Sequence, residues 1–142
     1  MATIKAHLER GTHVRISTRG HEWSADEPID QGGSNTGPTP YEILLGSLAA
    51  CTCVTLALYC HHKGIRLDAV DTEYEHDRIH ARDCEECEDD RTGFIDRIQS
   101  RVRISGDLDD AQRARLEQIV GRCPVHKTLE NPTILRDEVT FA

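Results

Sequence analysis

The hydrophobic and polar positions change their period several times along the chain, and each period predicts an element. Residues 2–20 alternate loosely, with "ERG" at 9–11 between two apolar phases, which predicts a β-hairpin. The segment 26–40, "DEPIDQGGSNTGPTP", is dense in Gly, Pro, Asn, Asp and Ser and therefore predicts a long loop. Long ordered loops are often functional.

A helix is expected after this loop. Thr39 can cap it, Pro40 suits its first turn, and Glu42 lies three residues after Thr39, the spacing of a capping box. The helix should run to about His62 and stop at Gly64. From 43 to 60, small or apolar side chains cover nearly all of its faces, which is typical of a helix buried at a domain centre or a subunit interface.

The second half of the chain alternates strands and helices. Residues 67–80 and 94–105 predict the two strands of a hairpin with a long acidic tip, and 107–123 predict a helix that begins near Asp109 or Asp110. A short helical turn should follow Cys123, and the alternating stretch 132–142 predicts a closing strand. This order predicts a single α+β domain, residues 1–142, in which an antiparallel sheet packs on helices.

Composition narrows the function classes. The chain has 142 residues, one Trp, two Phe and three Tyr, so its core must be mostly aliphatic. The net charge of −8 argues against binding a nucleic-acid backbone. The start shows no signal-peptide pattern, and the apolar run near 43–60 is short and rich in small residues for a membrane span, so a cytoplasmic protein is expected. In the cytosol, six cysteines indicate reduced, metal-bound or catalytic thiols.

Three of these cysteines lie in the predicted helix, within "GSLAACTCVTLALYC". At 100° per residue, Cys51 and Cys53 lie on roughly opposite sides, whereas Cys53 and Cys60 share a stripe. A buried cysteine is most often an ordinary core residue. Cys123 is different because it precedes Pro124 at the start of a helical turn, where backbone N–H groups can stabilise a thiolate, although it could equally be an ordinary cap.

The acidic tip holds a C-x-x-C motif in "HDRIHARDCEECED". Cys84 and Cys87 with His80 would make three ligands of a zinc site, whereas His76 lies about 13 Å from His80 along the same strand and cannot join without a bend. A redox-active pair is a second reading, although the surrounding Asp and Glu side chains disfavour thiolates. A solvated acidic turn without chemistry is the third.

Two motifs together resemble a known family. The stretch "GPTPYEILLGSLAACTCVTLALY", followed some seventy residues later by "CPVHKTL", is similar to the OsmC/Ohr family of thiol peroxidases, and the resemblance covers nearly the whole chain. It implies an OsmC-like fold in which antiparallel sheets wrap around two central helices of an intertwined homodimer. It also implies that Cys51 attacks a small organic hydroperoxide and becomes a sulfenic acid, which condenses with Cys123 to a disulfide that a dithiol reductant resets. No cofactor is required for this chemistry, and the Cys84/Cys87 tip is the separate candidate site for zinc.

The resemblance also implies a cation near Cys51, because the reaction needs a thiolate at neutral pH. Family members supply an arginine from the N-terminal hairpin, for which Arg10 is the best match, with Arg15 and Arg19 as alternatives. Their glutamate that orients the arginine lies ten residues before the reactive cysteine, where this chain has Tyr41, and Glu42 comes one place later. Tyr41 is expected to be able to donate a hydrogen bond to a peroxide oxygen.

This departure keeps two other functions open. The first alternative is a non-catalytic OsmC-like protein that binds a small molecule or zinc. The second is a stress-associated structural protein in which Cys51 is a plain core residue.

Overall fold

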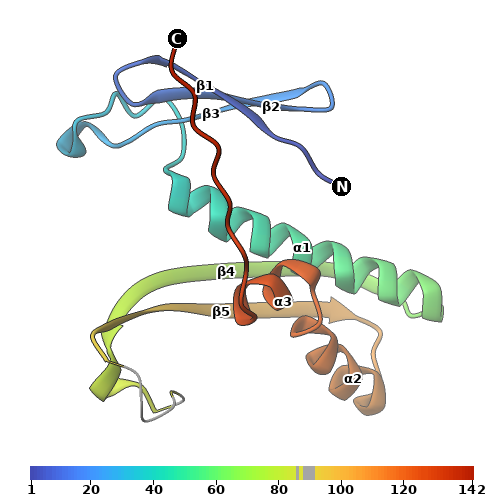
Figure 1. Cartoon of the computed structure of the whole chain (residues 1–142). Coiled ribbons are helices and arrows are strands. Elements are labelled where there is room, and N and C mark those ends of the chain that lie inside the picture. The colour runs from blue at the N-terminus through green and yellow to red at the C-terminus, as the bar shows by residue number, and fades with distance from the viewer. Residues whose placement is uncertain (86, 88–91) are drawn as a thin grey trace. The chain divides into compact units, whose positions relative to one another are not determined.

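The computed structural model describes residues 1–85, 87 and 92–142, so the predicted role of the acidic side chains at 86, 88 and 89 lies outside the described residues. The chain is α+β, with antiparallel sheets and three helices, as the sequence predicted (Figure 1). It divides into two compact units, residues 1–46 with 76–97 and residues 47–75 with 98–142, and each is described by itself.

The first unit is built on a three-stranded antiparallel sheet. Strands β1 (Lys5–Arg10), β2 (His13–Thr18) and β3 (His21–Ala25) follow one another in sheet order, with a register shift between Leu8 and Arg10. The predicted hairpin is therefore present, and the prediction missed β3. This strand is short, and its alternation in "HEWSA" leads directly into the loop.

The long loop after β3 is held by one buried carboxylate. Asp26 accepts hydrogen bonds from the hydroxyls of Thr12 and Thr36, both at 2.6 Å, and from the backbone N–H groups of Glu27, Ser34 and Thr36. The hydroxyl donors of Thr12 and Thr36 are the main reason that the pKa of Asp26 lies far below its usual range. A short 3₁₀ turn η1 (Ile29–Gln31) lies within the loop. Asp26 thus ties the β1–β2 turn to both ends of the loop.

Close approach of the backbone also fixes this loop. A Cβ atom at Gly33 would lie 1.9 Å from the carbonyl oxygen of Glu27, and one at Gly37 would lie 2.5 Å from that of Ser24. Only glycine fits at these two positions without moving the chain.

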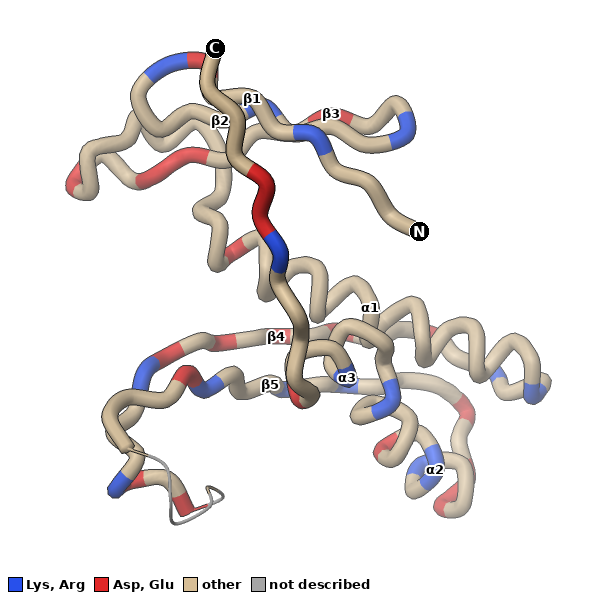
Figure 2. The backbone as a smooth tube through the Cα atoms, in the orientation of Figure 1, with Lys and Arg blue, Asp and Glu red and all other residues tan. Residues whose placement is uncertain are grey.

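Helix α1 (Pro40–Lys63) confirms the predicted bounds. Glu42 Oε2 accepts the Thr39 N–H at 2.7 Å, and Thr39 Oγ1 accepts the Glu42 N–H at 3.3 Å, so the capping box forms. Gly64 follows the helix with a φ of 65°, the left-handed conformation of a helix end. No Asp, Glu, Lys or Arg occurs between Glu42 and Lys63, and the body of the helix is tan in Figure 2. By length and composition α1 could also cross a membrane, a property that core helices share.

The second unit contains the hydrophobic core. Strands β4 (Leu67–His80) and β5 (Phe94–Gly106) form a two-stranded sheet, and their far ends belong to the first unit. Leu56 and Cys60 of α1 pack with Leu116 and Ile119 of α2 (Asp110–Val120), against partly buried side chains of both strands. Cys60 is therefore a core residue, and burial raises the pKa of its thiol.

The C-terminal end departs from the prediction. Helix α3 (Pro124–Glu130) follows Cys123 as expected, but residues 132–142 form no strand, and all their side chains are exposed. A strand needs a neighbouring backbone to hydrogen-bond with, and alternation alone cannot supply one. The alternating pattern of 132–142 remains without a partner in the described chain.

Candidate active site

The thiols of Cys51 and Cys123 lie together in the second unit. Cys51 comes from the middle of α1 and is half-buried, whereas Cys123 is the N-cap of α3 and is 0% exposed. Both thiols are free, and Cys51 donates a hydrogen bond to the sulfur of Cys123. Two residues that are 72 positions apart in the sequence therefore form a hydrogen-bonded pair of thiols.

The local surroundings favour the thiolate form of Cys123. Burial alone would raise its pKa, but the pKa is lowered because the sulfur accepts hydrogen bonds from Cys51, from the backbone N–H groups of His126 and Val125, and from Thr52. The His126 N–H lies 3.3 Å from Sγ. These N–H groups belong to the first turn of α3, where the helix presents unpaired donors.

Cys51 shows the opposite behaviour. Burial raises the pKa of its thiol, and the neighbouring Cys123 raises it further, while hydrogen bonds from the Val125 N–H and the Thr55 hydroxyl oppose this. Of the two thiols, Cys123 therefore has the lower pKa. Titration of such a pair belongs to both groups together, so the first deprotonation creates a single negative charge shared between them.

Thr52 and Tyr74 extend the site, and the sequence analysis missed both. The Thr52 side chain is 0% exposed, and its hydroxyl lies 2.8 Å from the Tyr74 hydroxyl. The Thr52 hydroxyl also hydrogen-bonds to the Cys123 sulfur, so hydrogen bonds link Tyr74 to the cysteine pair through Thr52. A polar threonine within an apolar helix was the available signal, because a buried hydroxyl needs a partner.

The other predicted site residues lie in the first unit. Arg10 ends β1, and Arg19 lies in the β2–β3 turn with a φ of 47°. Arg15, on β2, has its Nε 3.3 Å from Glu9 Oε1 and therefore pairs with a carboxylate of the same sheet. Arg10 stays the predicted arginine partner of Cys51.

Tyr41 and Glu42 lie in the first turn of α1. The Tyr41 ring stacks on His76, with ring centroids 4.4 Å apart, and His76 Nε2 lies 3.0 Å from Asp96 Oδ1. Glu42 uses one carboxylate oxygen to cap the helix. The structure therefore gives Glu42 a structural contact and holds Tyr41 by stacking.

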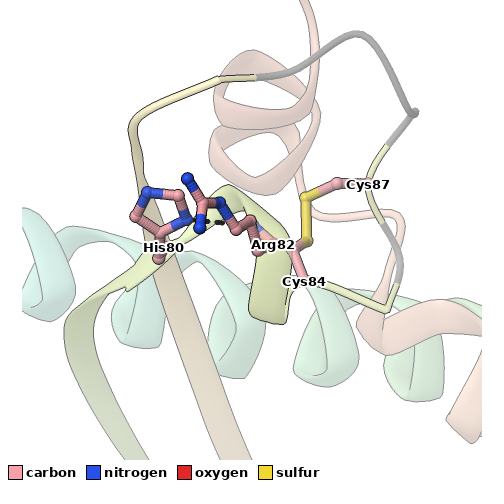
Figure 3. Close-up of a disulfide and its surroundings, with 4 residues drawn as sticks. All are labelled: His80, Arg82, Cys84 and Cys87. Atoms are coloured by element: carbon pink, nitrogen blue, oxygen red, sulfur yellow. Dashed lines mark hydrogen bonds between the residues drawn. A yellow bond between two sulfur atoms is a disulfide. The ribbon is translucent and has the colours of Figure 1, made fainter.

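The predicted zinc ligands do not form a metal site. Cys84 and Cys87 are joined in a disulfide at the hairpin tip (Figure 3), just after the 3₁₀ turn η2 (Ala81–Asp83). His80 Nδ1 accepts the Arg82 N–H at 3.2 Å. Among residues 1–85, 87 and 92–142, no group of three or more His, Cys, Asp or Glu side chains could hold a metal ion. Sulfurs bonded to each other are not available as thiolate ligands, which is why the predicted set is not formed.

Comparison with known proteins agrees with the fold and the cysteine motifs. The family model described as "OsmC-like protein" matches residues 32–136. The chain belongs to this family. The resemblance of its two cysteine motifs to OsmC and Ohr proteins is thereby confirmed.

Solved structures of OsmC-like proteins have the same fold. An OsmC-like protein from Mycoplasma pneumoniae is similar with a TM-score of 0.71 and 21% identity over 92% of this chain and 87% of that one. The organic hydroperoxide resistance protein OhrB of Bacillus subtilis is similar with a TM-score of 0.60 and 20% identity, over 90% of this chain and 89% of that one. An organic hydroperoxide resistance protein from Legionella pneumophila is similar with a TM-score of 0.63 and 20% identity, over 91% of this chain and 88% of that one. At these identities the likeness shows the fold alone. No curated protein matches this OsmC-like chain.

Proposed function

We propose that this OsmC-like protein is a cysteine-based peroxidase that reduces organic hydroperoxides through a Cys51/Cys123 cycle. The observation that supports it most directly is the hydrogen-bonded pair of free thiols, of which Cys51 is half-buried and Cys123 is fully buried. The half-buried sulfur can meet a substrate, and the buried one can meet only its neighbour. Structural relatives named as organic hydroperoxide resistance proteins support the same substrate class.

The chemistry begins with the single negative charge of the pair. With the one remaining proton of the pair on Cys123, the Cys51 thiolate attacks the distal oxygen of the hydroperoxide and the O–O bond breaks. The departing alkoxide takes the proton from Cys123, which leaves Cys51 as a sulfenic acid and Cys123 as a thiolate. The Cys123 thiolate then attacks the Cys51 sulfur, and hydroxide leaves and becomes water on protonation. Two thiols and one hydroperoxide give one disulfide, one alcohol and one water.

The donors around Cys123 assist both steps. The N–H groups of His126 and Val125 and the Thr52 hydroxyl stabilise its thiolate, so this thiol gives up its proton readily and then serves as the resolving nucleophile. A dithiol reductant must reset the disulfide, because nothing in the cycle itself supplies the two electrons.

A homodimer is part of the proposal. On α1, Val54 is 55% and Leu58 is 64% exposed, and they lie four residues apart on one face of the helix. All six residues of β1 and all of 132–142 are also exposed. An apolar helix with an uncovered face is unusual for a monomer, and a second copy of the chain would cover it.

The test begins with fully reduced protein. One equivalent of cumene hydroperoxide is added, thiols are trapped with a maleimide, and disulfides are mapped by mass spectrometry. We expect a Cys51–Cys123 disulfide in the wild type and in the control Cys53→Ser, none in Cys51→Ser, and a dimedone-reactive sulfenic acid at Cys51 in Cys123→Ser. If neither thiol oxidises faster than free cysteine at pH 7, the protein is not a thiol peroxidase.

A further inference from the structure

A groove in the first unit has no role in the peroxidase cycle proposed above. Its volume of about 930 Å³ lies within the usual range for a site that holds a small molecule. Residues 1–3 and 5 line it from the N-terminal segment, and residues 17–22 line it from the end of β2, the β2–β3 turn and the start of β3. The Thr18 hydroxyl donates to the Thr3 carbonyl oxygen at 2.9 Å and so ties these two segments together.

The groove is lined by basic side chains although the chain is acidic. Lys5, Arg19 and His21 contribute nitrogen donors, and Glu22 is the one carboxylate among the described lining residues. The whole chain has a net charge of −8 at pH 7. Basic side chains that gather at one groove of an acidic protein favour an anionic ligand.

Lys5 and Arg19 also lack carboxylate partners. Within residues 1–85, 87 and 92–142, neither side chain forms an ion pair. Arginines elsewhere in the chain do pair with Asp or Glu, namely Arg15, Arg78, Arg97 and Arg101. Like charges on one groove repel each other, and an anion bound between them would relieve this repulsion.

The backbone conformation of Arg19 supports a role for its side chain. Arg19 and Gly20 are the two central residues of the β2–β3 turn, with φ of 47° and 82°. Positive φ at both positions is the pattern of a type I′ turn, whose first central position favours asparagine, aspartate or glycine. An arginine in this left-handed conformation costs stability, and residues held in this way cluster at ligand-binding and catalytic sites.

We propose that this groove binds a small molecule that carries a diphosphate group. Lys5 and Arg19 are its main contacts, and His21 and the Ser17 hydroxyl are further donors. Arginine binds phosphate oxygens through two parallel hydrogen bonds, and lysine adds a point charge. A carboxylate has one charge and two oxygens and would leave most of these donors unused. A diphosphate has more negative charge and more oxygens, which matches two cations and two further donors.

The first experiment measures the binding of inorganic diphosphate to the full-length protein. Isothermal titration calorimetry is carried out without divalent cations at an ionic strength of about 0.15 M. We expect one site per chain in the wild type, and an affinity at least about tenfold lower in Lys5→Gln and in Arg19→Asn. Arg103→Asn removes an exposed arginine of β5 that does not line the groove, so this control should bind as wild type does.

Three results of this titration would overturn the proposal. The first is no binding to the wild type. The second is equal binding by the wild type and all three variants, and the third is binding that occurs only at low ionic strength. Each of the last two would mean an adventitious ion only, attracted by charge without a specific site.

Glu22→Gln should change the affinity in the opposite direction. This substitution removes the carboxylate from the groove lining and with it the repulsion of the phosphate charges, so diphosphate should bind more tightly. Glu138→Gln removes the same charge from the exposed stretch 132–142 and should leave the affinity unchanged. If the two variants strengthen binding equally, only net charge acts and the assignment of the groove is wrong.

Arg19→Asn separates the loss of binding from a loss of folding. Asparagine suits the first central position of a type I′ turn, so the variant should unfold at a higher urea concentration than wild type although it binds diphosphate poorly. Higher stability together with weaker binding excludes misfolding as the cause of the weaker binding. A variant that is less stable than wild type would contradict the argument from the conformation of Arg19.

Titrations with ADP and AMP identify the form of the ligand. Tighter binding of ADP than of inorganic diphosphate would indicate a diphosphate ester whose organic part also occupies the groove, and equal binding would indicate the diphosphate group alone. AMP should bind at least about tenfold more weakly than ADP, because a single phosphate has less charge and fewer oxygens. AMP that binds as tightly as ADP would overturn the choice of a diphosphate. The peroxidase proposal is independent of these results, because neither Cys51 nor Cys123 lines the groove.

Discussion

At the scale of single residues, the sulfur atom of Cys123 has both a structural and a chemical role. Its sulfur is the N-cap acceptor of α3 and also the partner of Cys51. The donors that cap the helix are thus the donors that stabilise the thiolate. The same arrangement explains why the sequence motif "CP" carries information, since a proline after the cysteine starts the helix whose N–H groups face the sulfur.

Thr52 offers the most direct test of the thiolate environment. Thr52→Val keeps the shape of the side chain and removes the hydroxyl that donates to Cys123, so the pKa of Cys123 should rise. Thiolate absorbance near 240 nm, followed against pH, should show a first deprotonation below the ordinary cysteine range in the wild type and a higher one in the variant. Thr128→Val is the matched control, because its hydroxyl donates to the Pro124 carbonyl oxygen. An unchanged first step in Thr52→Val would contradict the hydrogen-bond assignment.

Asp26 should make the stability of the protein depend on pH in the acid range. Its folded pKa is depressed below the unfolded value of 3.8, mainly by the Thr12 and Thr36 hydroxyls, so the carboxylate stabilises the fold fully above that value. The stabilisation is lost as pH falls from there through the folded pKa. We expect the free energy of unfolding, measured with urea at several pH values, to fall more steeply in wild type than in Asp26→Asn.

High salt supplies the control for this experiment. The exposed Asp77 and Asp96 also have lowered pKa values, through hydrogen bonds from Arg97 and Arg78 respectively, but surface pairs are screened by salt. The buried Asp26 network is screened much less. If wild type and Asp26→Asn have the same slope at high salt, Asp26 does not carry the acid dependence.

At the scale of elements, two substitutions at the N-cap of α3 distinguish the role of Cys123 in helix stability from its role as a thiol. Cys123→Ser keeps an oxygen that can accept the His126 N–H, whereas Cys123→Ala removes the acceptor and should cost about 1 kcal/mol of unfolding free energy. Both variants should lose the Cys51–Cys123 disulfide equally. Urea unfolding together with disulfide mapping distinguishes these effects. Equal stability of the two variants would mean that the cap contributes nothing.

Local chemistry explains which elements were predictable. Gly64 ends α1, and Asp109 caps α2 in a reciprocal box with Gln112, so both helices could be placed from neighbouring residues alone. The stretch 132–142 was mispredicted because a strand depends on a partner that local sequence does not contain. The Cys51–Cys123 pairing followed from the family resemblance, but Thr52 did not, because its partners are distant in sequence.

At the scale of the whole molecule, the exposed face of α1 is the feature that predicts assembly. Val54→Lys/Leu58→Lys should convert a dimer into a monomer, since two charges would be placed in an apolar interface and left without partners. Analytical ultracentrifugation measures the change. Glu117→Lys, on an exposed position of α2, is the control and should leave the mass unchanged. A wild-type protein that sediments as a monomer would contradict the proposed homodimer.

The His126 amide gives the protein an internal indicator of its oxidation state. Its nitrogen lies 3.3 Å from the Cys123 sulfur, and the hydrogen bond strengthens when that sulfur becomes a thiolate. A sulfur that has become half of a disulfide is uncharged and a much weaker acceptor. The nuclear magnetic resonance signal of this one N–H should therefore move upfield on oxidation, and the first turn of α3 should exchange its amide hydrogens faster. Each turnover would then be readable from a backbone group that takes no part in the reaction.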